Sequence, residues 1–395
     1  MLNKKDILNQ LLKWLPYILF FIFVFVFFCF YADHIFIYQE KYSLFIFSSE
    51  YLLDCLSQPG ALLKYLSAFL SAFYYYPVAG SFIATTVIIL SIIQLSAIIK
   101  LITAKENLLI PFLAGLLMFY LQADYSYMLY NNLGILIQLI AINLTIRYSK
   151  GYWPIIILPL WYFLNGGFAW IFYGIYCAWL IKSGFKKNLL KIILTVFVAV
   201  STVYVAAELI FWNSYHTLFE YPWSPGISNT DNIIFVFLVL LICTMPLISR
   251  VKFAINSNSI LNQKTVYITG IAFLIFGLTA SLLLRYDEKS NKYFKAEKLF
   301  YDGKYDDLIN YNMKYPTKNI ITLYLNNIAL CETGRLNEML FTFPQSPDGS
   351  TLFLKWTIEN EILRHGGNFY FTTGMINEAL RWAYEYMVMR GYTPE

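Results

Sequence analysis

The stretch Tyr76–Ile99, YPVAGSFIATTVIILSIIQLSAII, contains no charged residue over 24 positions. As a helix rising 1.5 Å per residue, it is long enough to cross the ~30 Å hydrocarbon core of a bilayer. In the whole chain of 395 residues, 58% are hydrophobic and only 13% are charged, against about 25% charged in a typical soluble domain. The sequence therefore predicts an all-α membrane protein. It excludes an ordinary cytosolic enzyme, a disordered chain and a nucleic-acid-binding protein.

Apolar segments of this kind recur through the first 285 residues and predict a polytopic bundle of about nine transmembrane helices. They lie at 14–37, 76–99, 109–122, 130–146, 153–165, 168–181, 189–212, 232–249 and 265–285. The break Asn165-Gly166-Gly167 favours two short spans over one long helix at 153–181. Two short amphipathic helices are expected at about 49–75, in the loop after the first span.

The positive charges predict how these spans are oriented. With a cytoplasmic N-terminus and alternating spans, 14 Lys and Arg residues fall on the cytoplasmic side, and only Lys41 and Lys64 fall in the outer loops. Residues 1–285 carry a net charge of +7 and residues 286–395 a net charge of −2. We therefore expect a transmembrane domain at 1–285, in an inner (cytoplasmic) membrane, and a periplasmic or exterior domain at 286–395.

The C-terminal domain reads as a series of helical hairpins, in which Gly303, Gly334 and Gly374 each end one helix before another begins. This pattern resembles the tetratricopeptide repeat, which implies a surface that binds proteins; a generic array of helical hairpins is the alternative. The last helix, Met375–Met389, carries so much apolar surface that a further repeat or a partner is expected to cover it. The chain is therefore predicted to be a truncated form of a longer protein.

The sequence contains few residues in spacings typical of a metal site or a catalytic site. The five cysteines show no metal or redox spacing, and no metal site is predicted with them. The carboxylates of the membrane domain are concentrated at the outer ends of the spans. The simpler interpretation is that they are solvent-exposed residues at the ends of loops, without a catalytic role.

Two resemblances bear on function. The amphipathic helices in the first outer loop and the acidic residues around it resemble the layout of the C-type glycosyltransferases. That resemblance implies a polyprenyl-phosphate lipid as donor, with Asp33 and Asp124 as base and metal ligand, Glu40 in reserve, and Lys41 or Lys64 binding phosphate. A divalent metal is expected only under this alternative. The whole chain, including Gln58-Pro59-Gly60-Ala61-Leu62-Leu63-Lys64-Tyr65-Leu66, also resembles a family of uncharacterised multi-span proteins of Bacteroidota.

The sequence thus leaves two functions open. The first is a membrane anchor, embedded in the lipid bilayer, that presents an exterior helical scaffold to an envelope protein. The second is a glycosyltransferase-like enzyme that acts on a lipid-linked donor at the outer face. A transporter is less favoured, because no ionisable residue is placed near the middle of a predicted span.

Overall fold

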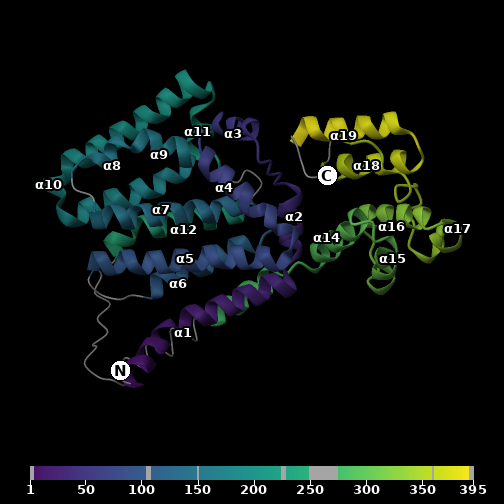
Figure 1. The fold of residues 1–395 in the computed structure, drawn as a ribbon, viewed down its shortest axis with the longest axis horizontal. Coiled ribbons are helices and arrows are strands. Elements are labelled where there is room, and N and C mark those ends of the chain that lie inside the picture. Colours follow the sequence, from purple (N-terminus) through teal and green to yellow (C-terminus); the bar gives the residue numbers. More distant parts are fainter. Residues whose placement is uncertain are drawn as a thin grey trace. The chain divides into compact units, whose positions relative to one another are not determined.

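The computed structural model describes residues 4–103, 108–148, 151–223, 228–248, 275–357 and 360–390. Within these ranges the chain forms helices and no strands (Figure 1), which confirms the predicted all-α class. The chain divides into two compact units: unit 1 comprises Met1–Gln39 and Phe45–Tyr286, and unit 2 comprises Glu40–Leu44 and Asp287–Glu395. A short segment of the first predicted outer loop is therefore built into the C-terminal unit.

Unit 1 contains the apolar helices of the described residues except Ile320–Glu332, which lies in unit 2. Within the described residues, five stretches are long and apolar enough to cross a membrane: Trp14–Tyr31, Pro77–Thr103, Leu129–Tyr148, Leu158–Ile210 and Asn229–Leu247. Leu109–Gln122 and Ile275–Arg285 form shorter apolar helices. Residues 249–274 lie outside the described ranges, and with them the start of the ninth predicted span and the basic residues Arg250, Lys252 and Lys264. Lys105, Glu106 and Lys150 lie outside them as well.

The elements of unit 1 follow the apolar pattern of the sequence. They are α1 (Lys4–Val26), η1 (Phe27–Tyr31), α2 (His34–Lys41), α3 (Ser49–Leu56), α4 (Ala61–Ser71), η2 (Ala72–Tyr75), α5 (Pro77–Thr103), α6 (Leu109–Gln122), α7 (Leu129–Tyr148), α8 (Trp153–Ile156), α9 (Leu158–Asn165), η3 (Gly166–Phe168), α10 (Ala169–Val205), η4 (Ala206–Phe211), α11 (Tyr215–Glu220) and α12 (Asn229–Ile248). Helix α2 begins in unit 1 and ends in unit 2. The short helices α3 and α4 occupy the region where amphipathic helices are predicted.

The core of unit 1 is made of apolar side chains with a few amide groups between the helices. Helix α5 packs against α6 and α7, and α12 packs against α6 and α10 (Figure 1). The Asn143 amide donates to Gln94 Oε1 over 2.6 Å, and the Trp161 indole donates to Gln138 Oε1 over 2.7 Å. These bonds link α7 to α5 and to α9. They stabilise the packing because a buried amide group without a hydrogen-bond partner costs free energy.

Two breaks shape the second half of unit 1. Helix α9 ends at Asn165, and Gly166 follows with φ 61°, so the predicted break at Asn165-Gly166-Gly167 is present. Helix α10 runs through Gly184, whose φ of 139° is not helical, and a kink divides the helix there. The Asn188 amide donates to the Leu180 and Gly184 carbonyls, so it satisfies backbone groups that the kink leaves without helical partners.

Three loops of unit 1 meet at this break. The Gly167 N–H donates to the Tyr221 carbonyl over 2.7 Å, and the Gly60 N–H donates to the Phe163 carbonyl over 2.9 Å. The Tyr162 hydroxyl donates to the Leu218 carbonyl over 2.7 Å. The loop before α4, the end of α9 with the residues after it, and the segment around α11 are therefore linked by two backbone hydrogen bonds and one side-chain hydrogen bond.

We expect Gly166→Ala to destabilise unit 1 by about 1–3 kcal/mol more than Gly151→Ala. Both glycines have positive φ, which costs a non-glycine residue about 1–3 kcal/mol. A Cβ at Gly166 would also lie 2.4 Å from the Tyr221 carbonyl oxygen, whereas nothing lies within 4 Å of one at Gly151. The midpoint of thermal unfolding in detergent measures the difference. Equal losses in the two variants would mean that the loops can separate at little cost.

In the described part of 287–390, unit 2 contains three pairs of helices, each joined by a glycine. Gly303, Gly334 and Gly374 have φ of 69°, 70° and 79°, a conformation that glycine adopts without strain. The elements are α14 (Glu288–Tyr301), α15 (Tyr305–Lys314), α16 (Ile320–Glu332), α17 (Leu336–Met339), η5 (Leu340–Thr342), α18 (Asn360–Thr372) and α19 (Ile376–Arg390). The second pair departs from a regular repeat, because α17 is only four residues long.

Candidate functional site

The most concentrated group of charges lies inside unit 2, around Glu297 of α14. The Lys41 ammonium lies 2.9 Å from Glu297 Oε1 and 2.7 Å from Oε2. Arg364 of α18 donates to Oε1 over 2.6 Å. The side chains of Lys41 and Glu297 are each 2% exposed, and that of Arg364 is 4% exposed. A buried carboxylate is thus held by two cations from separate parts of the chain.

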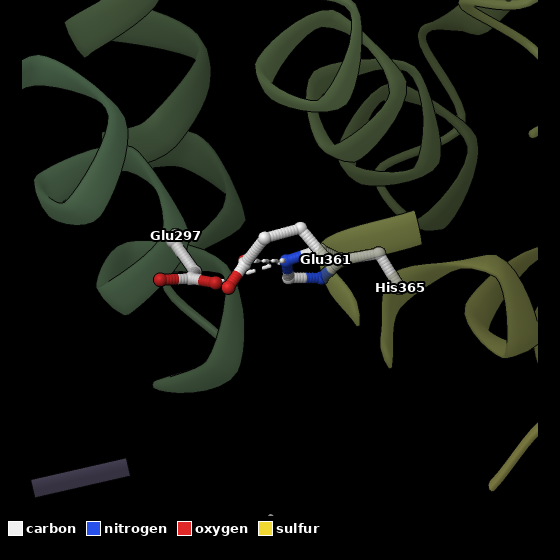
Figure 2. A group of neighbouring side chains, drawn as sticks. All are labelled: Glu297, Glu361 and His365. Atoms are coloured by element: carbon white, nitrogen blue, oxygen red, sulfur yellow. Dashed lines mark ion pairs between the residues drawn. The ribbon is translucent and has the colours of Figure 1, made fainter. Parts of the chain in front are cut away.

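A second carboxylate and a histidine complete this group. His365 Nε2 lies 2.9 Å from Glu297 Oε1 and 3.5 Å from Glu361 Oε2. The Glu361 carboxylate accepts hydrogen bonds from the hydroxyls of Tyr42, at 2.8 Å, and Tyr293, at 2.7 Å. Figure 2 shows Glu297 and the pair Glu361 and His365 pointing toward one another from two different helices. We call Lys41, Glu297, Glu361, Arg364 and His365 the buried charge cluster.

Helix α18 places three members of the cluster on one face, because Glu361, Arg364 and His365 are three and four residues apart. Tyr301 of α14 accepts or donates a hydrogen bond at His365 Nδ1 over 3.0 Å, so both ring nitrogens have partners. Lys41 is the last residue of α2. Its ammonium also lies 4.8 Å from the centre of the Phe294 ring, which is within range of a cation–π contact.

The electrostatics of the cluster favour charged carboxylates. Burial alone would raise the pKa of Glu297, but Lys41, the hydrogen bond from His365, and Arg364 lower it to about 2. The pKa of Glu361 is lowered as well: burial is opposed by its hydrogen bond to His365 and by the charge of Lys41. Burial lowers the pKa of Lys41, against the attraction of Glu297.

Glu297, Glu361 and His365 are residue types that bind metal ions, and their ligand atoms lie within 4.8 Å of one another. Two formal negative charges are, however, already matched by Lys41 and Arg364. A divalent cation would add two positive charges to a buried group and would have to displace the ammonium 2.7 Å from Glu297. The arrangement therefore fits a buried network of ion pairs that holds α2, α14 and α18 together better than it fits a metal centre.

A second charge group lies in unit 1, where three helices end. Arg285, at the end of the apolar helix Ile275–Arg285, contacts Asp231 and lies 3.3 Å from Asp124 Oδ2. Asp231 is in the first turn of α12, and Asp124 follows α6. The guanidinium carbon stands 4.0 Å from the centre of the Tyr120 ring. We call Asp124, Asp231 and Arg285 the arginine triad.

Comparison with known proteins gives a family without an assigned activity. A family model described as a family of unknown function (DUF6057) matches residues 9–395. The chain belongs to this family. Because the match runs from α1 to the C-terminus, both units are part of what defines the family. No curated protein and no solved structure matches the chain.

Membership of this family confirms the coarser part of the resemblance drawn from the sequence, an uncharacterised family. The family match says nothing of a source organism, of tetratricopeptide repeats or of glycosyltransferases.

The residues predicted from the sequence fall into both units. Asp33 lies half-buried at the start of α2, in unit 1, and Asp124 belongs to the arginine triad. Lys64, on α4, places its ammonium 4.3 Å from the centre of the Tyr221 ring, and burial lowers its pKa. Glu40 and Lys41 belong to unit 2.

These environments bear on the predicted roles. Asp124 Oδ1 accepts hydrogen bonds from the Ser126 N–H and hydroxyl at 2.8 and 2.6 Å, and Oδ2 faces Arg285. Lys41 is bound to Glu297 on both carboxylate oxygens. Burial raises the pKa of Glu40, although Lys298 and Arg364 oppose it. In this structure Asp124 is thus paired with Arg285, and Lys41 is paired with Glu297.

Sequence reasoning missed most of both groups. Glu297, Glu361, Arg364 and His365 were not singled out, although the spacing of the last three on one helix was a readable signal. In the sequence, Arg285 stands only as the last residue of the predicted transmembrane domain 1–285. A charged residue at the end of an apolar segment is a second signal that could have drawn attention to it.

Proposed function

We propose that the chain is an integral protein of a cytoplasmic membrane, with about nine spans, that presents unit 2 as a binding module for another protein of the envelope. The apolar helices of unit 1 support the membrane assignment. The distribution of Lys and Arg supports a cytoplasmic N-terminus and an exterior unit 2. The three glycine-joined helix pairs support a module similar to tetratricopeptide repeats.

The observation that carries the binding proposal is the exposed face of α19. On one side of this helix Trp382 and Tyr386 are buried and form a cluster with Leu363 of α18. On the other side Ile376, Leu380, Tyr384 and Val388 are 55–66% exposed. These four residues are spaced by four, so they form one apolar stripe along the helix.

A stripe of this kind is costly to leave in water and typically marks an interaction surface. Phe371, in the last turn of α18, and Met375, just before α19, are also exposed, at 68% and 54%. Residues repeating every four positions match an apolar helix laid alongside. We infer that the partner contributes such a helix.

Photo-crosslinking tests this function. A photoreactive phenylalanine at Leu380 of the full chain, in its native membrane, should form an adduct with one other protein. The same amino acid at Asn310, an exposed polar position of α15, should form none. The Leu380 adduct should disappear when Ile376→Ser and Tyr384→Ser interrupt the stripe. An adduct made only with a second copy of the chain, or none at all, would refute the proposal.

The alternative, a glycosyltransferase-like enzyme, finds two of its candidate residues in ion pairs, whereas Asp33, Glu40 and Lys64 stay candidates for it. It needs a carboxylate that is available as a base, and Asp124 is held by Arg285 and Ser126. It also needs a cation that is available for phosphate, and Lys41 is held by Glu297. We therefore base the proposal on the scaffold.

A further inference from the structure

The hairpin of α3 and α4 has an apolar surface that the proposed function does not use. Helix α4 buries Leu63, Ser67 and Ser71, which are spaced by four residues, and it packs against α7 and α9. A different side of α4 therefore remains for whatever lies around unit 1.

That side is a continuous apolar stripe. Leu62, Leu66, Phe69 and Phe73 are 36–45% exposed, and their spacing of four, three and four places them along one line of the helix. The Phe69 ring packs edge-on against Phe73 with 5.5 Å between ring centres. The aromatic part of the stripe is thus already ordered.

Helix α3 adds to the same apolar character. Leu52 and Leu53 are exposed, and Phe47, just before the helix, is 91% exposed. The acidic residues Glu50 and Asp54 are four residues apart and lie on another side of α3, since each residue turns the helix by about 100°. The helix is therefore amphipathic, with one apolar and one acidic side. We call Phe47, Leu52, Leu53, Leu62, Leu66, Phe69 and Phe73 the hairpin apolar surface.

The course of the chain indicates what covers this surface. No charged residue occurs between Lys64 and Lys100, and α4 is joined through η2 and Tyr76 to α5, a helix long enough to span a membrane. Tyr75 and Tyr76, at the junction, are exposed. Tyrosine is enriched where spanning helices leave the hydrocarbon. The hairpin is thus attached to a spanning helix at the level of the lipid headgroups.

The single cation of the hairpin points elsewhere. Lys64 is four residues after Gly60, whose N–H is bonded to α9, and its ammonium faces the Tyr221 ring. The hairpin apolar surface therefore carries no basic group that would select an acidic protein. Its chemistry is that of hydrocarbon and aromatic rings alone.

We propose that α3 and α4 form an interfacial element that inserts the hairpin apolar surface into the bilayer, at the end of unit 1 where α5 begins. Its partner is the acyl-chain region just below the headgroups of one leaflet, at a depth of about 5–10 Å. The acidic side of α3 faces water. This inference concerns unit 1 only and does not depend on α19.

Depth-dependent quenching tests the insertion. In a chain whose five cysteines are replaced by Ala, a single Cys at Leu66 or Phe69 carries an environment-sensitive fluorophore, and the protein is placed in phosphatidylcholine vesicles. Lipids spin-labelled near the headgroup should quench both sites more strongly than lipids labelled deep in the chain. Leu90→Cys, on the exposed side of α5, should show the reverse order. Asp307→Cys, exposed on α15, should be quenched only by iodide in the water.

Quenching of Leu66 and Phe69 by iodide, as at Asp307, would overturn the proposal, as would protection from both lipid and iodide, which means a protein cover. If the cysteine-free chain does not fold, the unmodified chain is irradiated with a phospholipid that carries a photoreactive group in its acyl chain. Adducts on the peptide spanning 61–73 are then expected. Adducts on the other spans but none on this peptide would exclude insertion.

Discussion

Lys41→Met should destabilise unit 2 by about 3–5 kcal/mol, the usual cost of removing one partner from a buried ion pair. Glu297 would keep Arg364 and His365, but the group closest to Oε2, at 2.7 Å, would be gone. The segment Glu40–Leu44 would also lose one of its links to the unit, while the Tyr42 hydroxyl still donates to Glu361. Hydrogen exchange of the full chain in detergent should show α14 and α18 opening at least about 100-fold more often.

A matched lysine supplies the control for this variant. Lys318 is exposed, in the same unit, and no ion pair involves it among the described residues. Lys318→Met should leave exchange unchanged. Glu297→Gln combined with Lys41→Met should cost less than the sum of the two single changes, since each single change leaves a charge uncompensated. Additive costs would show that Lys41 and Glu297 do not act as a pair.

The same cluster predicts a response to acid. The pKa of Glu297 is lowered from 4.5 to about 2 in the folded chain, so its charged form stabilises unit 2 above the unfolded value. The contribution of Glu297 to stability should therefore be fully present above about pH 5 and be lost as the pH decreases from about 4.5 toward about 2. In Lys41→Met the decrease should be smaller and should end at a higher pH, because one of the groups that lower this pKa is missing.

Much of the fold could be predicted because it depends on local patterns. An apolar run of the right length specifies a helix in unit 1 whatever its neighbours are, and the helix α6 coincides with the predicted segment 109–122. The turns of unit 2 are predicted by three glycines, Gly303, Gly334 and Gly374, because other residues rarely adopt a positive φ. Around Gly184 the sequence predicts a loop between the segments 168–181 and 189–212. The structure instead has one helix, α10, with a kink at Gly184.

The charge clusters could not be predicted, because their partners are far apart in the chain. Lys41 and Glu297 are separated by 256 residues, and Arg285 and Asp124 by 161. Composition and spacing say that Lys41 follows the first span, but not which carboxylate it meets. The predicted side of the membrane alone makes Lys41 a candidate for binding a lipid phosphate. Its burial beside Glu297 depends instead on how α14 and α18 pack, which the local sequence does not specify.

Arg285→Met should destabilise unit 1 by about 3–5 kcal/mol, as measured by the midpoint of unfolding in mixed detergent micelles. The side chain of Asp231 is only 3% exposed. Without the guanidinium, Asp231 and Asp124 would be two carboxylates near each other with no cation from the arginine triad. The helices α6, α12 and Ile275–Arg285 would lose the ion pairs that join their ends, so the loss should be cooperative across the unit.

Arg147→Met is the matched control, because Arg147 also ends an apolar helix but is exposed and has no ion pair among the described residues. It should leave the midpoint unchanged. Asp231→Asn should restore part of the stability of Arg285→Met, since it removes the more deeply buried uncompensated charge and keeps the shape of the side chain. If Asp231→Asn makes Arg285→Met worse, the charge of Asp231 has another partner, and the triad is not what joins the three helices.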